Sequence, residues 1–164
     1  MIPVPSPHDL HQRIASAYGS LDEPYFGTIQ AAYKTRPYAD VERALRERFH
    51  VTDDTDLNTD VSVVLIAQGA TGRWIVYLSL LGPYAVVNRG HEGPRCEVVV
   101  PPGVPGEEAD VFNILAAANI AVLPRELLEL PSALRRDLSE PTNASLFQAL
   151  FVDLDVLPWS TRAV

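Results

Sequence analysis

The densest group of potential ligands is the segment 51–60, VTDDTDLNTD, which contains four aspartates and an asparagine. The side chains that match positions 1, 3 and 5 of a calcium-binding loop are Asp54, Asp56 and Asn58. The template also needs glycine at position 6 and glutamate at position 12, where this chain has Thr59 and Leu65. An EF-hand is therefore excluded. A polar turn is the favoured interpretation, because Asp and Asn favour turns, and a calcium site without the template is the alternative.

A second group could perform nucleophilic catalysis, because His91 and Glu92 precede Cys96 by a few residues. Against this, Cys96 alternates with Val98 and Val100, which is typical of a small side chain on the buried face of a strand. Spacing alone does not establish that the histidine reaches the sulfur. We therefore favour a structural cysteine and keep a small Cys/His enzyme as the third hypothesis for function.

The remaining histidines and the known catalytic motifs give little support for an enzyme. His8 and His11 share a helix face at i, i+3, but a zinc site needs a third ligand, so surface positions are expected. The chain has no G-x-S-x-G elbow, no Walker loop, no G-x-G-x-x-G and no H-E-x-x-H. We assign no catalytic, cofactor-binding or metal-binding residue, and expect no cofactor.

Composition limits the classes of partner. The 164 residues carry a net charge of −8, which repels phosphate backbones and anionic membranes, so neither nucleic acid nor membrane is expected as a partner. The longest apolar runs, VSVVLIA and WIVYLSLL, fall short of the ~20 residues that span a bilayer. With one cysteine and no basic leader before an apolar run, the chain is expected to be cytoplasmic.

The patterns predict one α+β domain over 1–164, with a helical part at 6–50 and a β-meander at 60–101. Ser6 and Pro7 favour a helix start, and a firmer helix is expected at PYADVERALRERF. The runs that predict four antiparallel strands are DVSVVLIAQ, RWIVYLSLL, YAVVNR and RCEVVV. Both alternating sets of RWIVYLSLL are largely apolar, so this strand should be central.

The second helical part is expected at 107–152, packed on the sheet and followed by a tail at 153–164. Its first helix begins with acids, which complement the amides at a helix start. Short helices are expected at LPRELLEL and PSALRRDL, and Asn143 is expected to cap a helix over ASLFQALF. The apolar face of that last helix needs to be buried.

Three stretches resemble small cytoplasmic immunity proteins of bacterial polymorphic and contact-dependent toxin systems. They are VYLSLLGPYAVV, AAANIAVLPRELLELP and SLFQALFVDLDVLPW, and the likeness covers about residues 60–159. The resemblance implies a protein that works by binding and neutralising a cognate toxin. It assigns a role to no individual residue, because the interfaces of such proteins differ between members.

The first functional hypothesis is therefore a non-catalytic protein that covers a folded toxin domain with a basic surface, guided by negative charge. The expected contact acids are Asp53, Asp54, Asp56 and Asp60, followed by Glu107, Glu108 and Asp110. Tyr84 and Trp159 are expected to be exposed aromatic anchors. The alternative is an acidic secretion chaperone that holds an effector segment in apolar grooves. The sequence leaves the oligomeric state open.

Overall fold

The computed structural model describes residues 2–21, 26–90, 96–135, 143–153 and 157–160, and structural statements refer to these. The helices are α1 (Pro7–Tyr18), α2 (Gly27–Lys34), α3 (Ala39–Arg46), α4 (Glu107–Ala117), α5 (Arg125–Leu128) and α6 (Leu146–Leu150). The strands are β1 (His50–Asp53), β2 (Ser62–Gln68), β3 (Arg73–Ser79), β4 (Tyr84–Arg89), β5 (Glu97–Val99), β6 (Ala121–Val122), β7 (Pro131–Arg135) and β8 (Asn143–Ser145). The α+β class and the order of helices, meander and helices are confirmed.

The main sheet is an antiparallel meander in the order β1-β2-β3-β4-β5, with β6 added parallel to β4. In β3, Tyr77 lies opposite Val64 of β2 and Val86 of β4. Every residue of β3 except Arg73 is buried, so the expectation that this strand is central is confirmed. The sequence analysis missed β1, because its four residues alternate too briefly to stand out from the acidic segment that follows.

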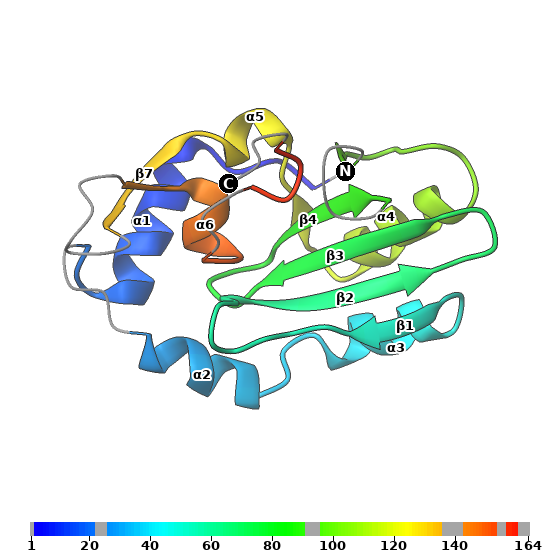
Figure 1. Ribbon diagram of the computed structural model, residues 1–164, viewed down its shortest axis with the longest axis horizontal. Coiled ribbons are helices and arrows are strands. Elements are labelled where there is room, and N and C mark those ends of the chain that lie inside the picture. Colours follow the sequence, from blue (N-terminus) through cyan, green and yellow to red (C-terminus); the bar gives the residue numbers. More distant parts are fainter. Residues whose placement is uncertain (1, 22–25, 91–95, 136–142, 154–156, 161–164) are drawn as a thin grey trace.

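Each face of the sheet has its own hydrophobic core. On one face, Leu65, Val76 and Val87 pack with buried side chains of α3 and α4. On the other face, Ile75 and Tyr77 pack with side chains of α1, α5 and α6. Figure 1 shows α3 and α4 behind the sheet, with α1, α6 and β7 gathered at one of its ends. The sheet is thus a central layer whose two sides support different groups of helices.

The start and end of α1 follow the sequence signals directly. The Ser6 hydroxyl accepts from the Asp9 amide (3.2 Å), and the Asp9 carboxylate accepts from the Ser6 amide (3.2 Å). This reciprocal capping box satisfies two amides that have no partner within the helix. Gly19 ends the helix with φ 71°, a conformation that glycine adopts without a steric penalty.

The edge strand β1 is held by α3, the helix that precedes it. Val41 and Leu45 are buried under the sheet, and the opposite side of α3 carries charges. From this side, Arg46 donates through Nη1 to the carbonyl oxygen of Val51 (2.9 Å). Its Nε and Nη2 donate to Oε1 of Glu42 (3.1 and 2.8 Å). One arginine therefore binds both its own helix and a backbone group of the edge strand.

The prediction of helices throughout 107–152 is wrong in its second half. Residues 131–135 and 143–145 form the β7–β8 hairpin, and 121–122 form β6. Asn143 lies in β8, and Ser145 caps α6 instead by accepting from the Gln148 amide (3.2 Å). The apolar side chains that were predicted to need burial are all completely buried: Leu146, Phe147, Leu150 and Phe151. Among the described residues, no helix is both long and apolar enough for a membrane span.

Candidate protein-binding groove

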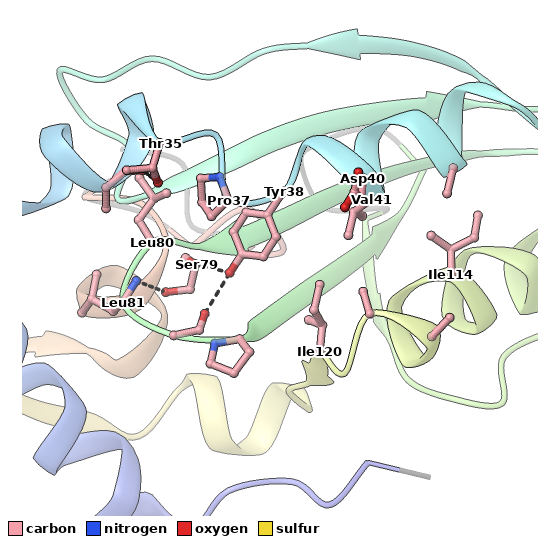
Figure 2. A pocket seen from close by; sticks show the side chains of 16 residues that line it. Thr35, Pro37, Tyr38, Asp40, Val41, Ser79, Leu80, Leu81, Ile114 and Ile120 are labelled. Atoms are coloured by element: carbon pink, nitrogen blue, oxygen red, sulfur yellow. Dashed lines mark hydrogen bonds between the residues drawn. The ribbon is translucent and has the colours of Figure 1, made fainter.

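An open groove of about 730 Å³ lies between α3 and α4, on the face of the sheet that these helices cover. Its floor is the β3–β4 connection at residues 80–83. One wall comes from α3 with the end of α2 and the segment between them, and the other from the second half of α4 and the residues after it. Figure 2 shows Tyr38 beside the β3–β4 connection, with Ile114 and Ile120 on the α4 side. We call this feature the α3–α4 groove.

Small side chains make the walls of the α3–α4 groove shallow. They include Ala32 and Ala44 on one side and Ala117 and Ala118 on the other. Just beyond the end of α3, Nη1 of Arg48 lies 3.0 Å from Oδ2 of Asp110 in the first turn of α4. This exposed ion pair is a weak link between the two helices.

The hydroxyl groups that line the groove are already bonded within the protein. The Tyr38 hydroxyl lies 2.5 Å from the carbonyl oxygen of Ser79 and 2.9 Å from that of Gly82, so it donates into the backbone of the floor. The Thr35 hydroxyl donates to the Ala32 carbonyl (2.7 Å), and the Ser79 hydroxyl to the Leu150 carbonyl (2.7 Å). Burial raises the pKa of Tyr38, which keeps its hydroxyl a neutral donor.

The chemistry that the groove can support follows from this lining. All sixteen lining residues are described, and none is a histidine, cysteine, lysine or arginine. Asp40 is the one charged side chain among them, and its Oδ1 lies 3.0 Å from Nη1 of Arg43. A nucleophile with an adjacent base is thus missing from this lining. What the groove offers to a ligand is apolar surface.

A second apolar groove, of about 520 Å³, lies on the other side of α4. Its lining includes Phe112 and Ala116 of α4 and two residues of the N-terminal segment, Ile2 and Val4. The exposed part of α4 between the two grooves is also uncharged. It consists of Ala116 and Ala117, which follow Ile114 and Leu115 in the chain. Uncharged exposed helix surface of this kind is typical of contact surfaces.

The acidic segment 53–60 forms a series of local turns. Oδ1 of Asp53 accepts from the Thr55 amide (3.0 Å), and Oδ1 of Asp56 accepts from the Asn58 amide (3.0 Å). These are side chain to backbone bonds two residues along the chain, as expected for Asx turns. Asp54 is exposed, and its amide bonds to the Val64 carbonyl (2.9 Å). The predicted polar turn is therefore present, but it joins strand β1 to strand β2, whereas the sequence predicted a turn between a helix and a strand.

Asp60 differs from its neighbours because it is only 8% exposed. Its Oδ2 accepts from the Asp56 amide (2.6 Å), and its backbone forms an isolated antiparallel bridge with Val152. Burial raises the pKa of Asp60, and the charges of Asp56 and Asp54 add to the shift. A carboxylate in this position closes the turn and offers little surface to a partner.

The acids at the start of α4 each bind a different segment of the protein. The Glu107 carboxylate accepts from the amides of Ala70 (2.7 Å) and Thr71 (2.9 Å), at the tip of the β2–β3 hairpin. The Thr71 hydroxyl also donates to this carboxylate (2.5 Å), and that bond, followed by the amide bonds, lowers the pKa of Glu107. Asp110 pairs with Arg48, as described above. Both acids were expected to contact a partner, and both hold neighbouring elements of the fold.

Glu108 is 3% exposed and lies at the centre of a polar cluster. It accepts from Nε and Nη2 of Arg89 (both 2.6 Å), from Nε1 of Trp74 (2.9 Å) and from the Val104 amide (3.0 Å). Burial alone would raise the pKa of Glu108, but the bonds from Arg89, Trp74 and Val104 outweigh it and lower the pKa to about 2. The acid is therefore a buried anion that joins α4 to β3 and β4.

The expected aromatic anchors are not exposed, so that expectation is wrong. Tyr84 is 8% exposed in β4, opposite Ala121 of β6. Trp159 is 4% exposed; its indole Nε1 donates to Oε1 of Glu129 (2.8 Å), and its ring packs edge-on against Phe147 at 4.9 Å. Both residues belong to the hydrophobic core that also contains α6, and large aromatic side chains contribute much apolar area to such a core.

The other residues with possible chemistry are separated in the structure. Nε2 of His11 lies 3.2 Å from the Pro131 carbonyl oxygen, whereas His8 is exposed. Cys96 is buried, and its suggested partners His91 and Glu92 lie outside the described residues. Within the described ranges, no three His, Cys, Asp or Glu side chains come together as a group that could hold a metal ion.

Comparison of the chain with protein-family models, with curated proteins and with solved structures finds no match.

The α3–α4 groove itself was missed by the sequence analysis. Its walls belong largely to α3 and α4, and the end of α3 at Arg46 is 61 residues before the start of α4 at Glu107. One signal was available: the stretch ILAAANI at 114–120 has no charged residue, although only Leu115 and Ile120 are buried. An uncharged stretch that leaves its other side chains accessible indicates a contact surface.

Proposed function

We propose that this protein is a non-catalytic binding protein that neutralises a toxin by covering its surface, and that the α3–α4 groove takes part in the contact. The observation that carries the proposal is the groove of about 730 Å³, lined by apolar side chains and by hydroxyl groups that are already bonded internally. Burial of such a surface against another molecule removes apolar area from water and stabilises the complex.

Charge supports a basic partner. The net charge of −8 attracts a positively charged surface from a distance and speeds association. The exposed acids Asp53, Asp54 and Asp56 belong to this field even though their side chains also form turns. Toxins that act on nucleic acids carry basic surfaces, and the resemblance to immunity proteins favours this class of partner.

The test of this function is a search for the partner in the native cell. A tagged copy of the chain should recover one protein in stoichiometric amount, and expression of that protein's toxic domain should stop growth unless this chain is co-expressed. A chain that turns over a metabolite and recovers no macromolecule would contradict the proposal.

The role of the acidic turns has its own test. Replacing Asp53, Asp54 and Asp56 together with Asn should keep the turns, because Asn also forms Asx turns, while it removes three charges. We expect slower association with the recovered partner and a weaker dependence on salt, measured by surface plasmon resonance. An unchanged rate at low salt would mean that these acids do not guide the encounter.

A secretion chaperone is the second candidate, and the pair of apolar grooves on either side of α4 favours it. A chaperone holds a non-globular effector segment, whereas an immunity protein binds a folded domain. If an isolated peptide segment of the recovered partner binds as tightly as the folded domain does, the chaperone becomes the better assignment.

A further inference from the structure

The α3–α4 groove restricts the kind of backbone that can occupy it. Its hydroxyls donate to carbonyl oxygens of the protein, and its remaining lining is apolar apart from Asp40. An extended peptide in this groove would bury its own N–H and C=O groups without partners, which is costly. An α-helix satisfies these groups internally and presents side chains alone.

We propose that the groove binds an amphipathic α-helix of the partner, with apolar side chains facing inward and Lys or Arg at one end. The proposal depends on the protein-binding function above and specifies the occupant of that site. Helix-in-groove binding uses apolar residues at i, i+3, i+4 and i+7. Ala44, Ala117 and Ala118 on the walls allow the close approach of about 8–10 Å that packed helices need.

The charges around the groove favour a basic residue on the bound helix. Asp40 is the one charged lining side chain; its Oδ1 lies 3.0 Å from Nη1 of Arg43, and its carboxylate is still largely exposed. The C-terminal half of α4 forms the opposite wall, and α4 has no basic residue in its last turn. The carbonyl groups at the end of α4 therefore add partial negative charge that no side chain of that turn offsets. A Lys or Arg on the bound helix complements both features.

A second copy of this chain is a poorer occupant. Each copy carries a net charge of −8, so two copies repel each other. A basic helix from another protein is instead attracted by the net negative charge of this chain. The occupant is accordingly assigned to a different chain, and self-association becomes one of the outcomes of the test.

The probe is a fluorescent peptide of about 18 residues, long enough for about five helical turns, with Leu at i, i+3, i+4 and i+7 and Lys elsewhere. One comparison peptide has the same Leu and Lys content in an order without helical periodicity. The other keeps the helical Leu pattern and has Glu in place of Lys. Fluorescence anisotropy at physiological salt should show that the helical Leu/Lys peptide binds at least about tenfold more tightly than either. Circular dichroism should show that this peptide gains helix on binding.

Two neighbouring alanines of α4 supply the matched variants. Ala117 and Ala116 are both exposed, but Ala117 lines the α3–α4 groove and Ala116 lines the groove on the other side of α4. Ala117→Tyr should weaken binding of the helical peptide about tenfold, whereas Ala116→Tyr should leave it unchanged. Both variants keep the same change in volume and charge, so a general effect on stability would act on both.

Several results would overturn the proposal. They are no binding of the helical peptide, equal binding of the peptide without helical periodicity or of the acidic peptide, equal loss in both variants, or a dimer in gel filtration that Ala117→Tyr dissociates. Failure of the proposed function looks different. In that case the native cell yields no partner, while the peptide measurements still report whether the groove accepts a basic helix.

Discussion

Two acidic clusters of this protein use carboxylates in opposite ways. In the segment 53–60, Asp53 and Asp56 bond to amides two residues away, and the buried Asp60 has a raised pKa. At the start of α4, Glu108 bonds to β3 and β4, and its pKa is lowered to about 2. The first cluster shapes its own loop, whereas the second connects elements far apart in the chain.

The comparison shows that clustering in sequence does not determine what an acid does. Asp60 has no arginine among the groups that act on it, so burial makes its charge unfavourable. Glu108 is buried more completely, but Arg89 supplies two bonds of 2.6 Å and makes its charge favourable. Whether the pKa of a buried acid is raised or lowered therefore depends on a partner from another element and not on the local density of acids.

The largest expected effect comes from removing the charge of Glu108. Glu108→Gln leaves Arg89 without its buried partner and should lower the free energy of unfolding by about 3 kcal/mol. Urea unfolding followed by tryptophan fluorescence measures this change, since Trp74 and Trp159 are both buried in the folded protein. The matched control is Asp110→Asn on the same helix, where the exposed ion pair with Arg48 is worth about 0.5 kcal/mol. Equal losses of stability in the two variants would contradict the conclusion that the buried Glu108 contributes more to stability than the exposed Asp110.

Glu108 and Asp60 should change the pH dependence of stability in opposite directions, because the pKa of one is lowered and that of the other is raised. Because the pKa of Glu108 is lowered, its contribution is complete above its ordinary pKa of 4.5 and is lost as the pH falls toward about 2. The difference in stability between the wild type and Glu108→Gln should therefore shrink over this range. Unfolding in urea at a series of pH values measures it, and a constant difference would mean that Glu108 is not an anion in the fold.

For Asp60 the sign is reversed and the effect is smaller. A raised pKa means that its charge lowers stability at neutral pH and that this penalty disappears as the pH falls through the pKa of the folded state. Asp60→Asn should raise the free energy of unfolding at neutral pH by less than about 1 kcal/mol. The wild type should reach the stability of the variant in acid. Lower stability of the variant at all pH values would show that the bonds of the carboxylate outweigh its burial.

The smallest effect is expected at Glu107, which is half-buried and accepts from amides at the tip of the β2–β3 hairpin. Glu107→Gln should increase hydrogen exchange at the Ala70 and Thr71 amides, since these donate to the carboxylate. The midpoint of urea unfolding should stay unchanged. Exchange that is unaltered at both amides would show that the hairpin keeps its position without this contact.

Elements with local signals were predictable from sequence, and elements that depend on distant strands were not. The capping box of Ser6 and Asp9 fixes the start of α1 within four residues. By contrast, β6 has two residues and exists because Tyr84 and Ala85 of β4 lie beside it. The β7–β8 hairpin was also missed, because a run such as PSALR has no clear period.

The same limit applies to the candidate site. The acidic turns of 53–60 were predicted correctly as turns, since Asp and Asn act on nearby backbone. The partners of Glu108 were not predictable, because Arg89 and Trp74 are 19 and 34 residues away. Burial of Trp159 likewise depends on Phe147 and Glu129, which only the fold brings together.

The hydrogen bond from Arg46 to the Val51 carbonyl bears on aggregation of the protein at high concentration. An exposed edge strand is a template onto which strands of other molecules can add, the first step of amyloid-like growth. Here a charged guanidinium, fixed by Glu42, occupies an acceptor on that edge. The edge strand β1 therefore presents one fewer free backbone acceptor to a strand of another molecule.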